Sequence, residues 1–312
     1  MPTVNGIVPF FPSEDSKLRA TALNIRRGGN CLNSIQVLEQ LLTEAERDTV
    51  QPYLVSCLPN VSSPATQRII ESFGPTSNVD FRHCIYREEN TEAASSYIIR
   101  SIESGSRTLV SYNDLPEMTI EEFEPIARSF TPDRETWWHF EGRIPDVTLQ
   151  CIRLLRDVLP KAQISIEVEK PGRGGLSELA AEADVIFYSR SWAEDRGHES
   201  PESCLRTEVH EKASLALCTW GADGAAGFSR PESEYIRCPA KDEVQGAISV
   251  VDAVGAGDTF IAGMLYGLVC HANDWSVGQK ISFAVRLATL KVQREGFAGL
   301  GAEVLGCVSE ES

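Results

Sequence analysis

Residues 250–260, Val-Val-Asp-Ala-Val-Gly-Ala-Gly-Asp-Thr-Phe, constrain this chain more than any other segment. The apolar pair Val250-Val251 predicts the end of a strand, and the apolar run from Thr259 predicts a long helix. The Gly-Ala-Gly turn between them would place unpaired backbone N–H groups at the helix N-terminus, where negative charge is stabilised. Asp258 adds a carboxylate at the same place. The segment is either a plain strand-to-helix connection or a phosphate cradle beside a base, which is the minimum for phosphoryl transfer.

Length and charge narrow the class of protein. The chain has 312 residues, which suits one large α/β domain or one domain with a small appendage. Its formal net charge of −16 disfavours nucleic acid and anionic membranes as partners. No apolar run approaches the ~20 residues that span a bilayer, and residues 1–15 lack the pattern of a secretory signal. We therefore expect a cytoplasmic protein.

Cysteine and histidine spacing gives no metal site. The nine cysteines form no Cys-x-x-Cys pair, and the five histidines are isolated along the chain. We expect reduced thiols that behave as small hydrophobic groups.

The first third of the chain predicts a mixture of elements. Helices are expected at 33–46 and 63–73, and a strand at 52–58. Three β segments then follow without a helix, at 81–86, 96–102 and 107–112. They predict a local antiparallel meander that would form a β lid.

From residue 119 the pattern alternates between helix and strand. The expected helices are 120–129, 146–158, 176–181, 202–210, 259–270 and 276–293. The expected strands are 137–140, 164–168, 185–188, 215–219, 235–238 and 249–251. Repeated βα units predict an α/β fold with a mainly parallel sheet sandwiched by helices, and ligands gather at the carboxyl ends of such strands.

A second motif, Arg-Arg-Gly-Gly-Asn-Cys-Leu-Asn-Ser, occupies residues 26–34. Gly28-Gly29 permits a left-handed turn or a close backbone approach. Asn30 and Asn33 are three residues apart, so both amides can face one ligand, and amides both donate to and accept from sugar hydroxyls. Taken alone, the motif fits an Asn helix cap equally well.

Together the two motifs resemble the ribokinase (PfkB-type) carbohydrate kinase family. Further segments resemble a ketose-phosphorylating branch of that family and occur in the same order: Pro12–Ser16, Gly105–Thr108, His139–Arg143, Glu167–Pro171 and Gly296-Phe297. The resemblance spans about residues 12 to 300. It implies one ribokinase-like kinase domain over residues 1–312, with a β lid from about 7–27 and 81–112.

The resemblance also implies roles for single residues. Asp258 would be the catalytic base, and the sugar would be held by Asp15, Gly29, Asn30, Asn33 and Arg143. ATP phosphates would meet Arg107 and an anion hole of Gly255, Ala256 and Gly257. The nucleotide would lie against Gly221, Ala222, Asp223 and Gly224. The implied cofactors are ATP with Mg²⁺, and a monovalent cation is allowed. The implied partners are a sugar and a second copy of the chain, bound through the lid.

Each of these roles has a plainer alternative. Arg107 would simply lie on an exposed strand, Arg143 and Lys170 would be surface charges, and residues 221–227 would be a hairpin connection. Trp137 and Trp138 are interpreted as core aromatics. No Walker A motif and no Gly-x-Gly-x-x-Gly between strand and helix is present, which disfavours P-loop kinases and dinucleotide enzymes.

The chain departs from the family at three places. Ala253 stands where the family usually has Thr, and residues 189–192, Ser-Arg-Ser-Trp, replace a magnesium-linked Asn-x-x-Glu motif. The family also opens with an apolar strand ending in a sugar-binding Asp, and residues 1–11 contain no Asp. Two explanations stay open: a truncated or spliced form of an active kinase, or a degenerate relative that binds ligand weakly. The substrate alternatives are another sugar, a keto-deoxy acid or a nucleoside.

Overall fold

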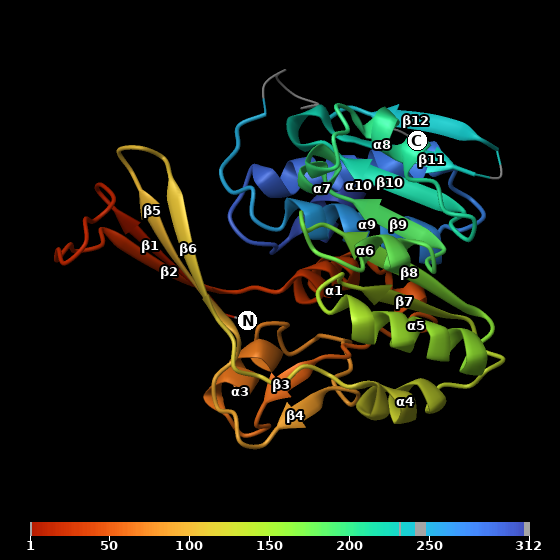
Figure 1. The fold of residues 1–312 in the computed structure, drawn as a ribbon, viewed down its shortest axis with the longest axis horizontal. Coiled ribbons are helices and arrows are strands. Elements are labelled where there is room, and N and C mark those ends of the chain that lie inside the picture. Colours follow the sequence, from red (N-terminus) through yellow and green to blue (C-terminus); the bar gives the residue numbers. More distant parts are fainter. Residues whose placement is uncertain (1, 231, 241–247, 309–312) are drawn as a thin grey trace. The chain divides into compact units, whose positions relative to one another are not determined.

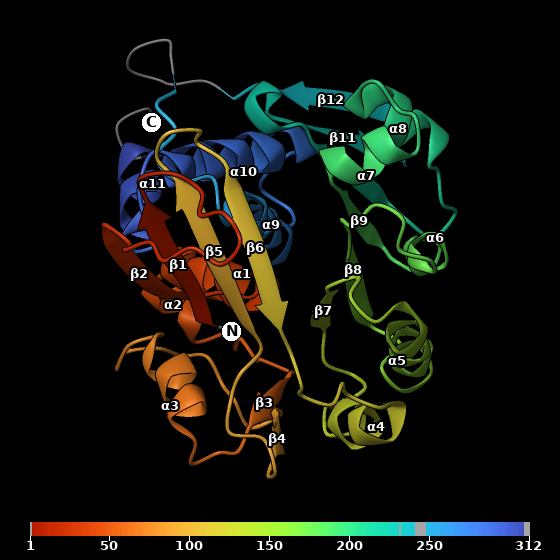
Figure 2. The same ribbon diagram turned by 60° about the vertical axis from the view of Figure 1, so that its left-hand side comes forward.

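The computed structural model describes residues 2–230, 232–240 and 248–308, with side chains described as far as residue 306. The chain divides into two compact units. The first unit consists of Met1–Leu32 and Pro52–Met118, and the second of Asn33–Gln51 and Thr119–Ser312. Each unit is described by itself below, and Figures 1 and 2 label the elements of both.

The first unit contains a sheet that we call the small sheet. Among the described residues its strands run in the order β2 (Ala22–Arg27), β1 (Pro2–Val8), β5 (Ser95–Ser101), β6 (Arg107–Tyr112). The predicted strands at 96–102 and 107–112 are therefore confirmed. The β5–β6 pairing is antiparallel, as expected, and the β1–β2 pairing, which the sequence did not predict, is antiparallel too, whereas β1 and β5 run parallel. A parallel partner from a distant segment leaves no local turn signal in the sequence.

One face of the small sheet is apolar across all four strands. Ile25, Val4, Tyr97 and Val110 occupy one cross-strand row, so they share a face. The exposed large side chains of this face, which we call the apolar face, are Leu23, Ile25, Tyr97, Val110 and Tyr112. The opposite face carries Arg107, which pairs with Arg100 in the register.

The rest of the first unit is built around a short parallel pair, β3 (Cys57–Pro59) and β4 (Ile85–Arg87). Helix α3 (Pro64–Glu71) begins after Ser63, whose hydroxyl caps the Thr66 N–H. The strands expected at 52–58 and 81–86 are shorter and shifted. The expectation that 81–86 continues into the lid meander is wrong, because β4 pairs with β3. Its beginning is delayed by a turn in which Asp80 accepts the Arg82 N–H.

The second unit contains the main sheet. Among the described residues its order is β12 (Glu234–Cys238), β11 (Ala225–Ser229), β10 (Leu215–Thr219), β9 (Val185–Tyr188), β8 (Ala162–Val168), β7 (Thr136–Phe140). Strands β7 to β10 are parallel, and β11 and β12 are antiparallel additions. The mainly parallel α/β sheet predicted for this region is confirmed. Within the described chain only β8 pairs with β7, so β7 is an edge strand.

Helices surround the main sheet in the second unit. Their bounds are α1 (Asn30–Leu41), α2 (Glu44–Arg47), α4 (Ile120–Arg128), α5 (Pro145–Val158), α6 (Leu176–Ala180), α7 (Arg190–Asp195), α8 (Pro201–Thr207), η1 (Gly221–Asp223), α9 (Ala256–Val269), α10 (Val277–Val292) and α11 (Leu300–Val308). The strand expected at 249–251 is wrong. The N–H groups of Val251 and Asp252 instead donate to the carbonyl of Val292 at the end of α10.

Side-chain alternation along the strands divides the core of the second unit into two layers. Val185 and Phe187 of β9 pack with Phe260 and Met264 of α9. Tyr188 points to the other face, where it stacks on Trp192 of α7. Figure 2 shows α9 and α10 on one side of the sheet and α5 to α8 on the other. Both faces of the parallel strands are therefore covered, as βα units require.

Helix α9 is buried on nearly all sides. Residues of α1, α10 and α11, and Leu42 directly after α1, form a second cluster with it: Val37, Leu41, Leu42, Ala262, Tyr266, Phe283, Leu287, Leu300 and Val304. Trp138 is buried against Phe123 and Phe130, which confirms its interpretation as a core aromatic. No helix in the described ranges has the length and apolar character needed to cross a membrane.

Candidate active site

The N-terminus of α9 forms the turn that the sequence predicts. Gly255 caps the helix with φ +82°, and an added Cβ there would lie 2.4 Å from the Phe297 ring. The first helical bond is that of Thr259 N–H to Gly255 O, at 2.9 Å. The N–H groups of Gly257 and Asp258 precede that bond, so they have no acceptor within the helix and lie at the positive end of its dipole. This arrangement suits an anion.

Asp258 is held in this first turn by two side chains of α1. Asn33 donates its Nδ2 to Asp258 Oδ2 at 2.7 Å, and the Ser34 hydroxyl donates to the Asp258 carbonyl at 3.0 Å. Asn33 is buried, and among the described residues its Oδ1 has no hydrogen-bond partner. A buried acceptor without a donor is costly, so Asn33 is suited to receive a hydroxyl from a ligand.

Burial changes the acidity of Asp258. It raises the pKa of this carboxyl to about 7, because the charged form loses solvation. The hydrogen bond from Asn33 lowers the pKa, and the charges of Glu167, Glu141 and Glu169 raise it. A carboxyl with a pKa near neutrality can accept a proton from an alcohol far better than an exposed aspartate can.

Comparison with known proteins identifies the family of this chain. Residues 3–300 match the model of the pfkB family of carbohydrate kinases. The chain belongs to this family. As a carbohydrate kinase it is a phosphotransferase, and the family membership expected from the sequence is confirmed.

Individual relatives agree with this assignment. The kinase is 27% identical over 304 residues to the ketohexokinase of Mus musculus, and the alignment covers 94% of each chain. It is 31% identical over 209 residues to a fructokinase of Rhizobium leguminosarum bv. trifolii, covering 62% of this chain and 59% of the relative.

Solved structures show the same fold. The ribokinase of Giardia lamblia matches with a TM-score of 0.77 at 15% identity, covering 100% of this chain and 96% of that one. The Arabidopsis thaliana ribokinase complexed with ribose and ATP matches with a TM-score of 0.74 at 19% identity, covering 98% and 95%. The expected ribokinase-like α/β fold is confirmed.

A polar network lies on the strands beside α9 in the kinase. His139 of β7 contacts the Ser165 hydroxyl through Nδ1 at 2.9 Å and Glu167 through Nε2 at 3.1 Å. Trp137 donates its indole N–H to the same hydroxyl. Glu167 is buried, so His139 supplies the partner that a buried carboxylate needs. The network fixes one of the carboxylates that act on Asp258.

Residues 221–224 connect two antiparallel strands. They form η1 and the turn between β10 and β11, so the hairpin connection expected at 221–227 is found at 221–224, and residues 225–227 belong to β11. Gly224 has φ +86°, and a Cβ there would lie 2.1 Å from Cys238 O, so only glycine fits. Gly221, Ala222 and Asp223 are exposed. Their contact with the nucleotide stays a prediction.

The other predicted residues lie in both units. In the first unit, Asp15 lies in the exposed turn between β1 and β2 with φ +58°. Gly29 has φ +109° and directly precedes Asn30, the first residue of α1. Arg107 is the first residue of β6, and its side chain is exposed. In the second unit, Arg143 is exposed on the loop between β7 and α5. Their substrate contacts stay predictions.

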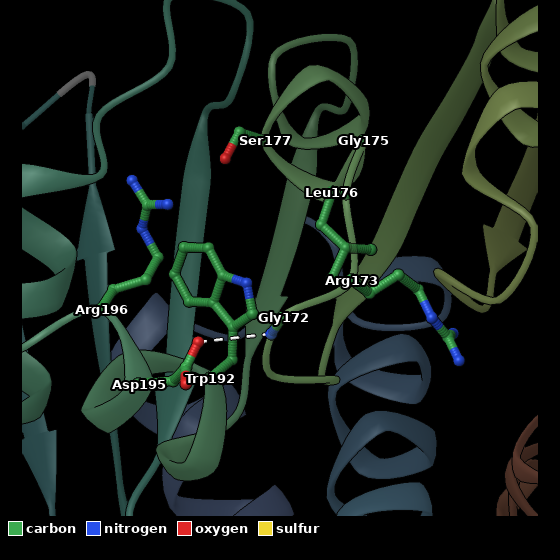
Figure 3. A pocket seen from close by; sticks show the side chains of 9 residues that line it. Gly172, Arg173, Gly175, Leu176, Ser177, Trp192, Asp195 and Arg196 are labelled. Atoms are coloured by element: carbon green, nitrogen blue, oxygen red, sulfur yellow. Dashed lines mark hydrogen bonds between the residues drawn. The ribbon is translucent and has the colours of Figure 1, made fainter.

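A pocket of about 260 Å³ in the second unit is separate from these residues. Figure 3 shows it between α7 and the loop before α6, and its lining is Gly172, Arg173, Gly174, Gly175, Leu176, Ser177, Trp192, Asp195 and Arg196. Its arginines are engaged elsewhere: Arg173 donates to Gly142 O, and Arg196 bonds Glu208. Asp195 accepts the Gly172 N–H. None of the predicted site residues lines this pocket.

The sequence left five contributors to the site unassigned. Ser34 bonds the backbone of Asp258, and Lys291 bonds the backbone and carboxylate of Asp252. The charges of Glu141, Glu167 and Glu169 raise the pKa of Asp258. The sequence does indicate that Lys291 is buried, because it lies on the same face of α10 as the apolar residues Ala284 and Leu287.

Proposed function

We propose that this kinase transfers the γ-phosphoryl group of ATP to a hydroxyl of a ketose, with fructose converted to fructose 1-phosphate. The observation that carries the proposal is the hydrogen bond from Asn33 to Asp258 at the N-terminus of α9. It joins the two motifs predicted for sugar and phosphate on one pair of helices. The similarity to a ketohexokinase along nearly the whole chain supports a ketose as the acceptor.

The proposed chemical step uses Asp258 as general base. The carboxylate accepts the proton of the sugar hydroxyl as its oxygen forms a bond to the γ-phosphorus of ATP. The bond between the γ-phosphorus and the bridging oxygen of the β-phosphate breaks, and ADP leaves with that oxygen. Asp258 is then left protonated, and its pKa of about 7 allows it to release the proton near neutral pH.

The turn before α9 would stabilise the charge on the transferred group. The N–H groups of Gly255 and Gly257 are the proposed donors, together with the helix dipole, whereas the Ala256 N–H already donates to Ala253 O at 3.3 Å. Such donors are typically worth ~3–4 kcal/mol each in the transition state. Arg107 is proposed to neutralise further phosphate charge, and residues 221–224 to contact the nucleotide.

The sugar is proposed to contact Asp15, Gly29, Asn30, Asn33 and Arg143. The buried Oδ1 of Asn33 supports this, because a sugar hydroxyl would donate to it.

Mg²⁺ is proposed to arrive with ATP. Glu141 and Glu169 are the proposed ligands, because their charges act on Asp258 and their carboxylates supply the oxygen donors that Mg²⁺ prefers. When bound with ATP, Mg²⁺ would supply positive charge that offsets the negative charge of the phosphates.

A coupled assay that measures ADP release tests the proposal. The panel contains fructose, other ketoses, aldoses, 2-keto-3-deoxygluconate and a nucleoside. The highest kcat/KM with fructose, and a product phosphorylated at the 1-hydroxyl, would support it. Preference for another acceptor would retain the kinase chemistry and overturn the ketose assignment.

A second candidate is a kinase that binds ligands but turns over poorly. The observation that favours it is that residues 2–8 form β1 of the small sheet, while β7 is an edge strand of the main sheet in the described chain. The family's Asp-bearing first strand is thus not among the described strands. ATP binding measured by calorimetry, with no turnover on the whole panel, would favour this candidate.

We further propose that residues 1–312 act as one kinase domain that forms a homodimer through the small sheet. The exposed apolar face supports this, because such patches commonly mark interfaces and open strand edges need covering. The cytosol is the proposed location. The eight cysteines with described side chains are free thiols, in keeping with a reducing compartment.

A further inference from the structure

Lys291 is the most deeply buried charged side chain near the candidate site. It lies in the last turn of α10, and its side chain is 0% exposed. A buried ammonium is expensive unless oxygen partners replace its water. Its Nζ donates to the carbonyl oxygen of Asp252 at 2.9 Å and lies 3.3 Å from Asp252 Oδ2. It also lies 5.4 Å from the centroid of the Phe297 ring.

These contacts converge on the turn that leads into α9. Asp252 precedes Gly255 by three residues, and its Oδ1 accepts the Val254 N–H at 3.1 Å. The N–H of Asp252 also donates to Val292 O, beside Lys291 in the chain. On the other side of the turn, the Phe297 ring occupies the space that a Cβ on Gly255 would need. Lys291 thus contacts both the segment that begins the turn and the ring that limits it.

We propose that Lys291 is a positioning residue. Its ammonium acts as a cation tethered within the chain and fixes the conformation of the 252–255 turn. The turn thereby orients Asp258 and the N–H groups at the N-terminus of α9. This rests on the proposed function of that turn. A carbonyl oxygen, a carboxylate oxygen and an aromatic face are the partners that a monovalent cation would take. Because the chain supplies the charge itself, the turn needs no added monovalent cation.

Lys291→Met tests the proposal, since it keeps the side chain as far as the position next to Nζ and removes the charged ammonium. We expect kcat to fall by about tenfold to a hundredfold, as for a misplaced catalytic group, with little change in the sugar KM. Methylammonium or ammonium ions should restore kcat in a saturable way. A folded variant with the kcat of the wild type, or one that these ions do not rescue, would overturn the proposal.

Lys280→Met is the matched control. Lys280 is a buried lysine of the same helix, and it bonds Ala272 O far along the chain from the 252–255 turn. Its replacement should lower the melting temperature without lowering kcat and without any response to ammonium ions. A rescue of both variants would show a general salt effect and overturn the assignment to Lys291.

Two measurements keep the proposal testable independently. Should Lys291→Met fail to fold, the wild type is assayed in sodium, potassium, ammonium and choline salts: equal rates support the tethered cation, and a requirement for one ion overturns it. Calorimetric binding of ADP to wild type and variant needs no turnover. A lower affinity of the variant for ADP supports the positioning role, even if the proposed ketose is not the acceptor. Equal affinity for ADP in the two proteins contradicts it.

Discussion

Asn33 donates its side-chain amide to Asp258 Oδ2 over 2.7 Å, although 225 residues separate them in the chain. The contact joins the beginning of α1 to the first turn of α9. It leaves Oδ1, the oxygen of the Asn33 amide, buried and without a partner among the described residues. One side chain therefore orients the base and offers an acceptor for the hydroxyl that the base deprotonates.

Asp258→Asn should remove catalysis while leaving the nucleotide site in place. The amide is nearly isosteric but cannot accept the proton, so kcat is expected to fall by about a thousandfold or more. ATP affinity, measured by calorimetry, should stay within about twofold, since no nucleotide contact is assigned to this side chain. Equal turnover in the variant would remove Asp258 from the mechanism.

The pH dependence follows from the raised pKa of Asp258. The base must be ionised, so kcat/KM should rise with pH and level off above about 7. The free energy of unfolding should instead fall as the pH rises. An unfolded aspartate has its ordinary pKa of 3.8, and the folded carboxyl binds its proton more tightly. The stability that Asp258 contributes through this proton is fully present below the unfolded pKa of 3.8 and is lost as the pH rises to about 7.

The control for that trend is Asp258→Asn, which has no ionisation at this site. Its melting temperature should exceed that of the wild type at alkaline pH, and the gap should narrow on acidification. A pH-independent gap would show that burial does not perturb this carboxyl.

Asn33→Ala should move the acid limb of the rate profile. The Asn33 hydrogen bond lowers the pKa of Asp258, so its loss should shift the limb to higher pH. The sugar KM should also rise, because the buried acceptor is removed. Ser34→Ala is the comparison, since its hydroxyl bonds only the Asp258 backbone and should leave the limb in place. Coincident limbs in all three proteins would contradict the assignment.

Gly255→Ala should damage the turn itself. The position has φ +82°, and the new Cβ would press on the Phe297 ring at 2.4 Å. The expected loss in the free energy of unfolding is ~1–3 kcal/mol from backbone strain alone, measured by denaturant unfolding. Gly257→Ala is the control: a Cβ there meets nothing within 4 Å, so stability should be retained. Similar losses in both variants would argue against the turn geometry.

Val110→Glu tests the proposed dimer. It places a charge in the middle of the apolar face, and light scattering behind size-exclusion chromatography should report a monomer where the wild type gives a dimer. Ser111→Glu introduces the same charge on the opposite face of β6 and should leave the dimer intact. A monomeric wild type, or dissociation by both variants, would show that the apolar face is not the interface.

The local sequence pattern was enough to predict much of the secondary structure of the second unit. Strands such as Val185–Tyr188 are continuous apolar runs between helices, and the sequence predicts them within a residue or two. The pairings of β3 with β4 and of β1 with β5 escaped prediction, because parallel partners from distant segments leave no turn between them.

The same distinction between local and distant contacts applies to the candidate site. The Gly255 turn and Asp258 are contiguous, so their geometry could be anticipated from spacing. The bond from Lys291 to Asp252 depends on how the end of α10 packs against the preceding loop, and only an interrupted apolar stripe pointed to it.

Every residue of α9 from Asp258 to Gly267 is buried. A substitution along this helix would have to be absorbed by neighbours on α1, α10 and the sheet before it could alter the chemistry. Divergence toward a new acceptor molecule is therefore expected to accumulate in exposed loops such as those of Asp15 and Arg143, while the helix bearing the base is inherited unaltered. Engineering a different sugar preference should begin with libraries in those loops.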